Sequence, residues 1–107
     1  MQPLTHSTPF LTSITVKPDC VDEYMKLAKE TDSAVEASEP GMLHHTFDND
    51  VSGGPTQFVW SEVYANDAAF MAHISNPPVG EHLTKHAELA THFEDEFFER
   101  VWVCVCV

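Results

Sequence analysis

Apolar and polar residues alternate along several short stretches of the chain, as they do in strands that bury one face of a sheet. The clearest stretch is 57–65, and one of its faces carries three aromatic rings and a carboxylate, from Phe58, Trp60, Tyr64 and Glu62. Stretches rich in β-branched and aromatic residues predict further strands at 10–17 and 42–47. A fourth strand is expected at 97–107, where both faces are apolar.

After Pro18, apolar residues recur at helical spacing, and proline suits the first turn of a helix. The apolar stripe of this predicted helix consists of Val21, Tyr24, Met25, Ala28 and Val35. Asp32 projects near the middle of the stripe. Its carboxylate either lies at a solvated edge of the helix or faces a pocket.

A short helix is predicted after the third strand. Asn66 is a suitable N-cap for it, and proline after Asn76 ends it, because a residue before proline is driven out of the helical region. The helical spacing places Phe70, His73 and Ile74 on one face.

The last predicted helix runs from about 79 to about 96. Its apolar stripe consists of Val79, Leu83, Ala90, Phe93 and Phe97. His86 falls within this stripe and His82 on its border.

These elements follow the order β-α-β-β-α-α-β, which predicts an α+β, ferredoxin-like sandwich with a four-stranded antiparallel sheet and helices on one face. Residues 1–9 are expected to form a flexible N-terminal arm, and 10–107 a single domain. Because the closing strand is apolar on both faces, the other side of the sheet needs a cover. A second copy of the chain is the simplest cover, so we expect a homodimer with the two sheets face to face.

Composition narrows the classes of partner. The 107 residues carry a formal charge of −12, which argues against nucleic acid and disfavours anionic membrane surfaces. No apolar run is long enough to span a bilayer, and the N-terminus shows no export signal. We therefore expect a cytoplasmic protein.

The three cysteines do not suggest a disulfide framework. Cys104 and Cys106 alternate on one face of the closing strand, where they are poorly placed to bridge each other. A metal ion could contact Cys104 and Cys106, or His82 and His86, which are four residues apart. Neither pair has an evident third ligand. We therefore expect no metal site.

The element order and several motifs resemble the antibiotic biosynthesis monooxygenase branch of the dimeric α/β-barrel superfamily. The resemblance covers about 10–105 and is fairly specific for the fold. The motifs that carry it are Glu39-Pro40-Gly41, Trp60-Ser61-Glu62-Val63-Tyr64, Asn66-Asp67-Ala68-Ala69-Phe70 with His73, and the Asn76-Pro77-Pro78 break.

The monooxygenases of this branch use no metal or flavin. They deprotonate an electron-rich phenol or quinol, whose carbanion then reduces molecular oxygen. The resemblance thus implies a small aromatic substrate, oxygen as the second substrate and no cofactor. His73 matches the histidine of the family's short helix and is the expected base, because imidazole titrates near neutral pH. Trp60 and Tyr64 would stack on the substrate ring or donate to its oxygen.

Other residues would complete the lining of the pocket. They are Phe70, His82, His86, Glu62 and one of His44 and His45, which point to opposite faces of their strand because they are adjacent. Glu62 lies between two aromatic residues on one face, so its carboxylate needs either a pocket or an ion pair with Arg100.

The sequence departs from the haem-degrading relatives, which use an Asn, a Trp and an axial His. The end of the first strand, Thr12-Ser13-Ile14-Thr15, offers no Asn, and Tyr64 stands near the place of their Trp. Haem degradation is therefore disfavoured.

Two other functions fit the same residues. His73 could transfer a proton in an isomerase that acts on a small metabolite. Alternatively, the chain could be a non-catalytic dimeric module that binds a small ligand. In that case His73, His86, Trp60 and Tyr64 would serve as packing residues.

Overall fold

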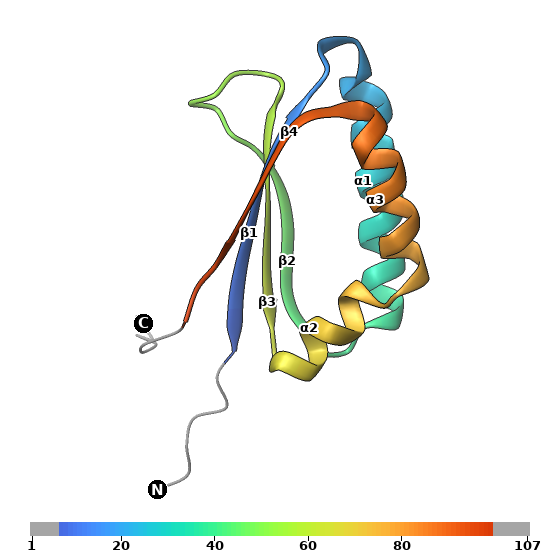
Figure 1. The fold of residues 1–107 in the computed structure, drawn as a ribbon, viewed down its shortest axis with the longest axis vertical. Coiled ribbons are helices and arrows are strands. Elements are labelled where there is room, and N and C mark those ends of the chain that lie inside the picture. The colour runs from blue at the N-terminus through green and yellow to red at the C-terminus, as the bar shows by residue number, and fades with distance from the viewer. Residues whose placement is uncertain (1–6, 100–107) are drawn as a thin grey trace, which may run out of the picture.

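The computed structural model describes residues 7–99 and contains one four-stranded antiparallel sheet. Its strands lie in the order β2-β3-β1-β4 (Figure 1). Their bounds are Thr8–Val16 for β1, Met42–Asn49 for β2, Gln57–Tyr64 for β3 and Ala90–Phe97 for β4. The ferredoxin-like arrangement predicted from the sequence is confirmed.

The helices cover one face of this sheet (Figure 1). They are a short 3₁₀ turn η1 (Pro18–Cys20), α1 (Val21–Ser38), α2 (Asp67–Ile74) and α3 (Pro77–Leu89). The predicted N-cap of α2 forms, because the Asn66 side chain accepts a hydrogen bond from the backbone N–H of Ala69 at 2.9 Å. The helix α3 begins at Pro77, two residues before its predicted start, and its first turn contains the two prolines.

The core lies between the sheet and the helices α1 and α3. It contains two residues of β1, two of α1, two of β3 and one of α3, namely Ile14, Val16, Tyr24, Ala28, Phe58, Trp60 and Leu89. The face of β3 predicted from its alternation is the buried one, and it turns toward the helices. The predicted stripe of α1 holds except at Met25, which is half exposed.

The outer face of the sheet carries both apolar and polar side chains. Leu11, Val59 and Val63 lie there half-buried, next to Ser13 and Ser61. On β4 the same face carries acidic residues that are exposed, Glu94 and Glu96.

The prediction for the end of the chain was wrong. The helix expected to reach about 96 ends at Leu89, and 90–97 forms β4 instead of helix. Phe93 and Phe97 fit a helical stripe and also fit one face of a strand, because four residues separate them. Pairing with β1, in which Ile14 opposes Phe93 and Phe10 opposes Phe97, selects the strand. Most of the predicted closing strand 97–107, including Cys104, Cys106 and Arg100, lies outside the described residues.

The strand β1 begins at Thr8, two residues before its predicted start, and β2 extends to Asn49, two residues past its predicted end. Boundaries of this kind depend on backbone pairing with neighbouring strands, which the side-chain pattern does not encode.

Gly41 is required where α2 meets the start of β2. A Cβ atom at Gly41 would lie 2.6 Å from the Cβ of Ala69 in the first turn of α2. The Gly41 carbonyl also accepts a hydrogen bond from the N–H of Ala65 at 2.8 Å. Both contacts hold the beginning of α2 against the start of β2.

We predict that Gly41→Ala lowers the free energy of unfolding by about 1–3 kcal/mol, because the added methyl group overpacks this contact. Gly80→Ala is the matched control. Nothing lies within 4 Å of a Cβ at that helical position, so alanine there should raise stability by up to about 1 kcal/mol. Urea denaturation measures both changes. A Gly41→Ala variant as stable as the original chain would contradict this account of the α2 contact.

Candidate functional site

A cavity of about 320 Å³ lies between the inner face of the sheet and the helices. Every described element except η1 and β2 contributes to its wall. The apolar part of the wall is mainly aromatic and consists of Phe10, Val35, Trp60, Phe70, Ile74, Val79, Leu83, Phe93 and Phe97. The polar part consists of Thr12, Thr31, Asp32, Glu62, His73, His82, His86 and Asp95. A cavity of this size suits a small ligand with a largely apolar body.

Strand register places the sheet side of the wall in rows. Phe10 of β1 lies between Glu62 of β3 and Phe97 of β4. In the next row, Thr12 lies between Trp60 and Asp95, and its hydroxyl donates to Asp95 Oδ1 at 2.9 Å. The strict alternation of β3 thus puts its carboxylate and its indole side by side on the cavity wall.

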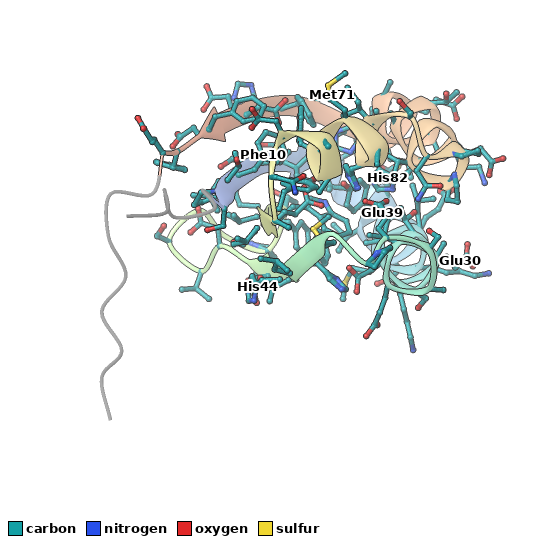
Figure 2. The ribbon with its side chains drawn as sticks, turned by 90° about the horizontal axis from the view of Figure 1, so that it is seen from below. Phe10, Glu30, Glu39, His44, Met71 and His82 are labelled. Atoms are coloured by element: carbon teal, nitrogen blue, oxygen red, sulfur yellow. The ribbon has the colours of Figure 1, made fainter. Side chains whose placement is uncertain are left out.

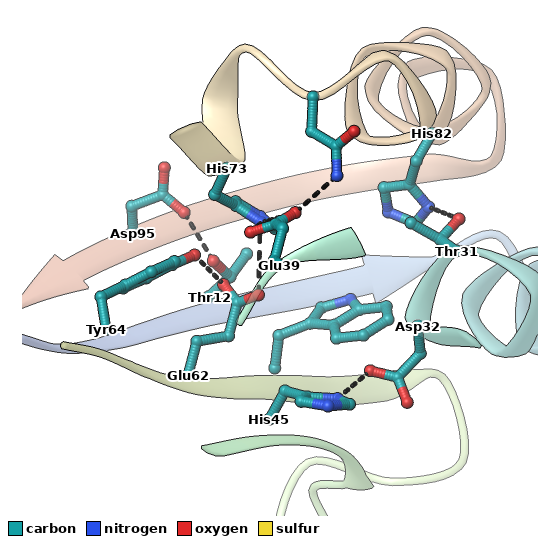
Figure 3. A network of polar contacts seen from close by, with 12 residues as sticks. Thr12, Thr31, Asp32, Glu39, His45, Glu62, Tyr64, His73, His82 and Asp95 are labelled. Atoms are coloured by element: carbon teal, nitrogen blue, oxygen red, sulfur yellow. Dashed lines mark hydrogen bonds and ion pairs between the residues drawn. The ribbon is translucent and has the colours of Figure 1, made fainter. Parts of the chain in front are cut away.

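At one end of the cavity, His73 of α2 is held by Glu39, which caps the C-terminus of α1 (Figure 3). The Nδ1 atom of His73 lies 2.9 Å and 3.0 Å from the two carboxylate oxygens of Glu39. The amide of Asn76 donates to the same carboxylate at 2.8 Å. Because a carboxylate only accepts, Nδ1 carries the proton and Nε2 has a free lone pair.

The Nε2 atom of His73 faces Glu62, whose Oε2 lies 3.6 Å away. This separation is longer than a hydrogen bond, so Nε2 can still accept a proton from a ligand. The other oxygen of Glu62 accepts a hydrogen bond from the Tyr64 hydroxyl at 3.1 Å. Burial raises the pKa of Glu62, and the Glu39 carboxylate adds to this effect, although His73 and Tyr64 oppose it. Glu62 is therefore a second group that can hold or release a proton here.

A second polar cluster lies on the side of the cavity near α1 and α3. The Trp60 indole N–H donates to the Tyr24 hydroxyl at 3.2 Å, and that hydroxyl lies 2.8 Å from Nδ1 of His86. The Thr31 hydroxyl lies 3.1 Å from Nδ1 of His82 (Figure 3). Burial raises the pKa of the Tyr24 phenol, so the hydroxyl keeps its proton at neutral pH.

Both histidines of this cluster are buried and uncharged at neutral pH. Burial lowers the pKa of His82 to about 4, and repulsion from His86 and His73 when these rings are protonated adds to the effect. Burial also lowers the pKa of His86, although Asp95 opposes it. The Nε2 atom of His86 finds no hydrogen-bond partner among residues 7–99. A buried polar atom in that state costs about 1–3 kcal/mol.

The structure brings most of the predicted site residues to this cavity. His73, Trp60, Glu62, Phe70, His82 and His86 all line it. Tyr64 is fully buried behind the wall and contacts the site through Glu62. The Trp60 N–H is already bonded to Tyr24, which leaves the indole ring itself as its surface toward a ligand.

The two adjacent histidines point to opposite faces of β2, as predicted. His45 pairs with Asp32 of α1 through Nδ1 (Figure 3). His44 is exposed and projects from the outer surface of β2 (Figure 2), so it takes no part in the cavity. Asp32 borders the pocket, but its carboxylate pairs with His45, and its side chain is 34% exposed, so it lies at a partly solvated edge of the site.

Sequence reasoning missed Glu39, Tyr24, Thr31 and Asp95. Glu39 was noted only as part of the Glu39-Pro40-Gly41 motif, without a role in the site, and Tyr24 only as part of an apolar stripe. Their partners, His73 and His86, are 34 and 62 residues away along the chain. Asp95 was hidden by the wrong assignment of its segment to a helix.

The described residues contain no group of three or more His, Cys, Asp or Glu side chains that could hold a metal ion. Among the same residues, no helix is long and apolar enough to cross a membrane.

The family model described as antibiotic biosynthesis monooxygenase matches residues 11–85 of this chain. That match includes all of α1, β2, β3 and α2 and most of β1 and α3. The cluster around His73 lies within it, whereas His86 of the second cluster lies just beyond its end. A search of curated proteins found no significant match.

Solved structures show the same fold. A candidate antibiotic biosynthesis monooxygenase from Bacteroides thetaiotaomicron is 20% identical, with a TM-score of 0.84 over 98% of this chain and 99% of that one. A candidate from Deinococcus radiodurans is 18% identical, with a TM-score of 0.83 over 94% and 98%. A variant of SnoaB, a cofactor-independent oxygenase from Streptomyces nogalater, is 23% identical, with a TM-score of 0.76 over 91% and 95%.

The lowered pKa of His82 predicts a loss of stability in acid. In the unfolded chain His82 takes up a proton near pH 6.5, and in the folded chain only near pH 4. Between these values the unfolded state binds more protons, so the free energy of unfolding falls as the pH falls. We expect His82 to account for a decrease of about 1–2 kcal/mol between pH 7 and pH 5.

Urea denaturation at both pH values measures this decrease, which should be smaller in His82→Gln. His86 acts in the same direction and Glu62 in the opposite one, so the difference between variants isolates His82. His92→Gln is the control, because the His92 side chain is 58% exposed. Equal decreases in the original chain and in His82→Gln would exclude the buried neutral state of His82.

Proposed function

The chain belongs to the antibiotic biosynthesis monooxygenase family, and on this premise we propose that it is a monooxygenase that works without metal or flavin on a small phenol or quinol. The observation that supports this most directly is the setting of His73. Glu39 holds its Nδ1 atom, and Nε2 is turned toward Glu62 in an aromatic-lined cavity of about 320 Å³.

In the proposed first step, His73 Nε2 removes a proton from the bound substrate. The Glu39 carboxylate then stabilises the imidazolium, because the Nδ1–H to carboxylate hydrogen bond becomes charge-assisted. Glu62, held by Tyr64, lies next to the same nitrogen and donates to the substrate oxygen when it is protonated. Tyr64 thus acts by positioning Glu62.

The substrate anion then supplies the electrons for oxygen. One electron passes to O₂, and the resulting radicals combine to form a C–O bond and a peroxide. For a substrate with a CH₂ group, such as an anthrone, the O–O bond then breaks as the remaining C–H proton is transferred to the departing oxygen. The products are a ketone and water, so R₂CH₂ and O₂ give R₂C=O and H₂O. His73 returns its proton to the departing oxygen.

The aromatic wall serves this chemistry in two ways. The rings of Phe10, Trp60 and Phe70 offer flat apolar surfaces to an aromatic substrate. They also keep the number of competing water molecules low, which strengthens the interactions of Glu39, His73 and Glu62 with the developing charge.

Oxygen uptake by chelator-treated protein tests the proposal. Hydroquinones, naphthols and anthrones form the panel, with autoxidation subtracted. We predict uptake above background that falls by a factor of about 10² to 10⁴ in His73→Gln, because general base catalysis contributes factors of this size. Glutamine can still donate to Glu39, so the fold should be retained, and circular dichroism checks this.

The matched control is His92→Gln, which changes an exposed histidine of β4 outside the cavity wall and should leave uptake unchanged. Uptake that survives in His73→Gln would remove His73 from the role of base. If no compound of the panel is consumed while hydrogen exchanges at a substrate carbon, the oxygenase proposal fails and proton-transfer isomerisation replaces it.

We also propose that the chain forms a homodimer through the outer face of its sheet. The half-buried apolar side chains of Leu11, Val59 and Val63 on that face support this arrangement, as does the family resemblance. The helices already cover the other face.

We predict that Val63→Glu shifts the protein from dimer to monomer, because a carboxylate at the centre of the contact loses its water. Val51→Glu is the control, since Val51 is 87% exposed in the loop between β2 and β3. Light scattering after gel filtration gives the mass of each variant. A Val63→Glu variant that stays dimeric would place the contact elsewhere.

A further inference from the structure

His82 and His86 lie one turn apart on α3, and both line the cavity. Their ring centroids are 5.7 Å apart, so one ligand atom can contact both rings. In each ring the Nδ1 atom is bonded to a protein hydroxyl, and Nε2 of His86 has no partner among residues 7–99. The proposed reaction at His73 uses neither residue.

The hydrogen bonds of Tyr24 determine which nitrogen of His86 carries the proton. The Tyr24 hydroxyl accepts from the Trp60 indole, which can only donate. Tyr24 is completely buried, and among the described residues the acceptor for its hydrogen is Nδ1 of His86 at 2.8 Å. Nδ1 therefore accepts, and the proton of the neutral ring is on Nε2.

The resulting Nε2–H group of His86 is a buried donor without an acceptor among residues 7–99. His86 is 6% exposed. The ring of Phe93 contacts His86 edge to face with centroids 5.0 Å apart, but it offers no oxygen or nitrogen. A native fold rarely leaves such a group unpaired unless something else supplies the acceptor.

Thr31 imposes the opposite state on His82. The Thr31 hydroxyl donates to the backbone carbonyl of Leu27 at 2.9 Å, so its single proton is already used. Toward Nδ1 of His82, 3.1 Å away, it can only accept. Nδ1 therefore carries the proton of His82, and Nε2 is left as an acceptor.

We propose that His86 and His82 form a donor–acceptor pair that recognises a neutral hydroxyl group of the substrate. The hydroxyl oxygen accepts from Nε2–H of His86, and the hydroxyl hydrogen is donated to Nε2 of His82. His73 and His82 lie on different sides of the site (Figure 3), so this hydroxyl belongs to a part of the molecule away from the reacting carbon. The inference rests on the proposed function for the aromatic body of the substrate.

The substrate class is thus an aromatic compound with two separate oxygen substituents, the second of which is a free hydroxyl. A methyl ether accepts but cannot donate to His82. An amine donates but is a poor acceptor for His86. Because burial lowers the pKa of both histidines, the pair is uncharged at neutral pH and offers no countercharge to a carboxylate or phosphate.

The two proton positions can be observed without any ligand. Long-range proton–nitrogen NMR spectra of the ¹⁵N-histidine-labelled protein distinguish the two neutral forms of each ring. We expect protonation of Nε2 in His86 and of Nδ1 in His82. The same form in both rings would overturn the proposal.

Binding measured by calorimetry without oxygen tests recognition separately from turnover. The probes are 2-naphthol, the 2,6- and 2,7-dihydroxynaphthalenes and the monomethyl ether of each diol. We expect one diol to bind at least about tenfold more tightly than 2-naphthol and than its own ether, as two added hydrogen bonds would give.

Two conservative variants should reduce this preference to about threefold or less. Tyr24→Phe removes the group that fixes His86, and Thr31→Val removes the one that fixes His82. Thr84→Val is the matched control, because the Thr84 hydroxyl also bonds the carbonyl four residues earlier but lies exposed on α3. It should keep the full preference.

The outcomes separate this inference from the proposed function. A diol preference lost in both variants, without oxygen uptake, would support the hydroxyl site and reject the oxygenase. Oxygen uptake that depends on His73, without any diol preference, would support the oxygenase and reject the hydroxyl site. A preference that persists in both Tyr24→Phe and Thr31→Val would also overturn the inference.

Discussion

The contact between Glu39 and His73 joins the end of α1 to α2 at one end of the cavity. Glu39 ends α1, and His73 lies on α2, which the close approach of Gly41 and Ala69 holds against β2. Without the carboxylate, either ring nitrogen of His73 could carry the proton. With it, Nε2 is left to accept, and the short helix is tied to the longest helix of the fold. One hydrogen-bonded pair thus contributes both to the proposed chemistry of the site and to the packing of α2.

Hydrogen-bond partners also fix the positions of protons at the other side of the cavity. Polar atoms in a dry wall must find partners, and each partner decides where a proton lies. Tyr24 and Thr31 each have one hydrogen and give it to different kinds of acceptor, so two identical side chains on α3 take opposite forms. The different proton positions in His82 and His86 thus come from the hydroxyl groups of Thr31 and Tyr24 that contact them.

The sequence predicted the fold well where a single pattern applied, and failed where two patterns were possible. The alternation of β3 and the proline and asparagine signals around α2 and α3 each allow one interpretation, and the structure has those elements. The segment 90–97 fits a helical stripe and a strand face equally well, and only pairing with β1 decides between them. In the site, His73 and Trp60 were found from the sequence because they belong to motifs. Glu39 also belongs to a motif, but its role and that of Tyr24 were missed, because partners 34 or more residues away give them these roles.

Structures with about 20% identity keep this fold almost completely, so the backbone carries little information about the substrate. In this chain the preference for a substrate is expected to come from polar atoms of the cavity that lack a partner, such as Nε2 of His86. Stability alone would favour an apolar residue in place of His86, because its buried Nε2 costs free energy in the empty cavity. A ligand that supplies the missing acceptor recovers that cost on binding, and a ligand without it does not. Among ligands of similar size, the unpaired nitrogen of His86 therefore discriminates most strongly in favour of those that carry an acceptor at this position.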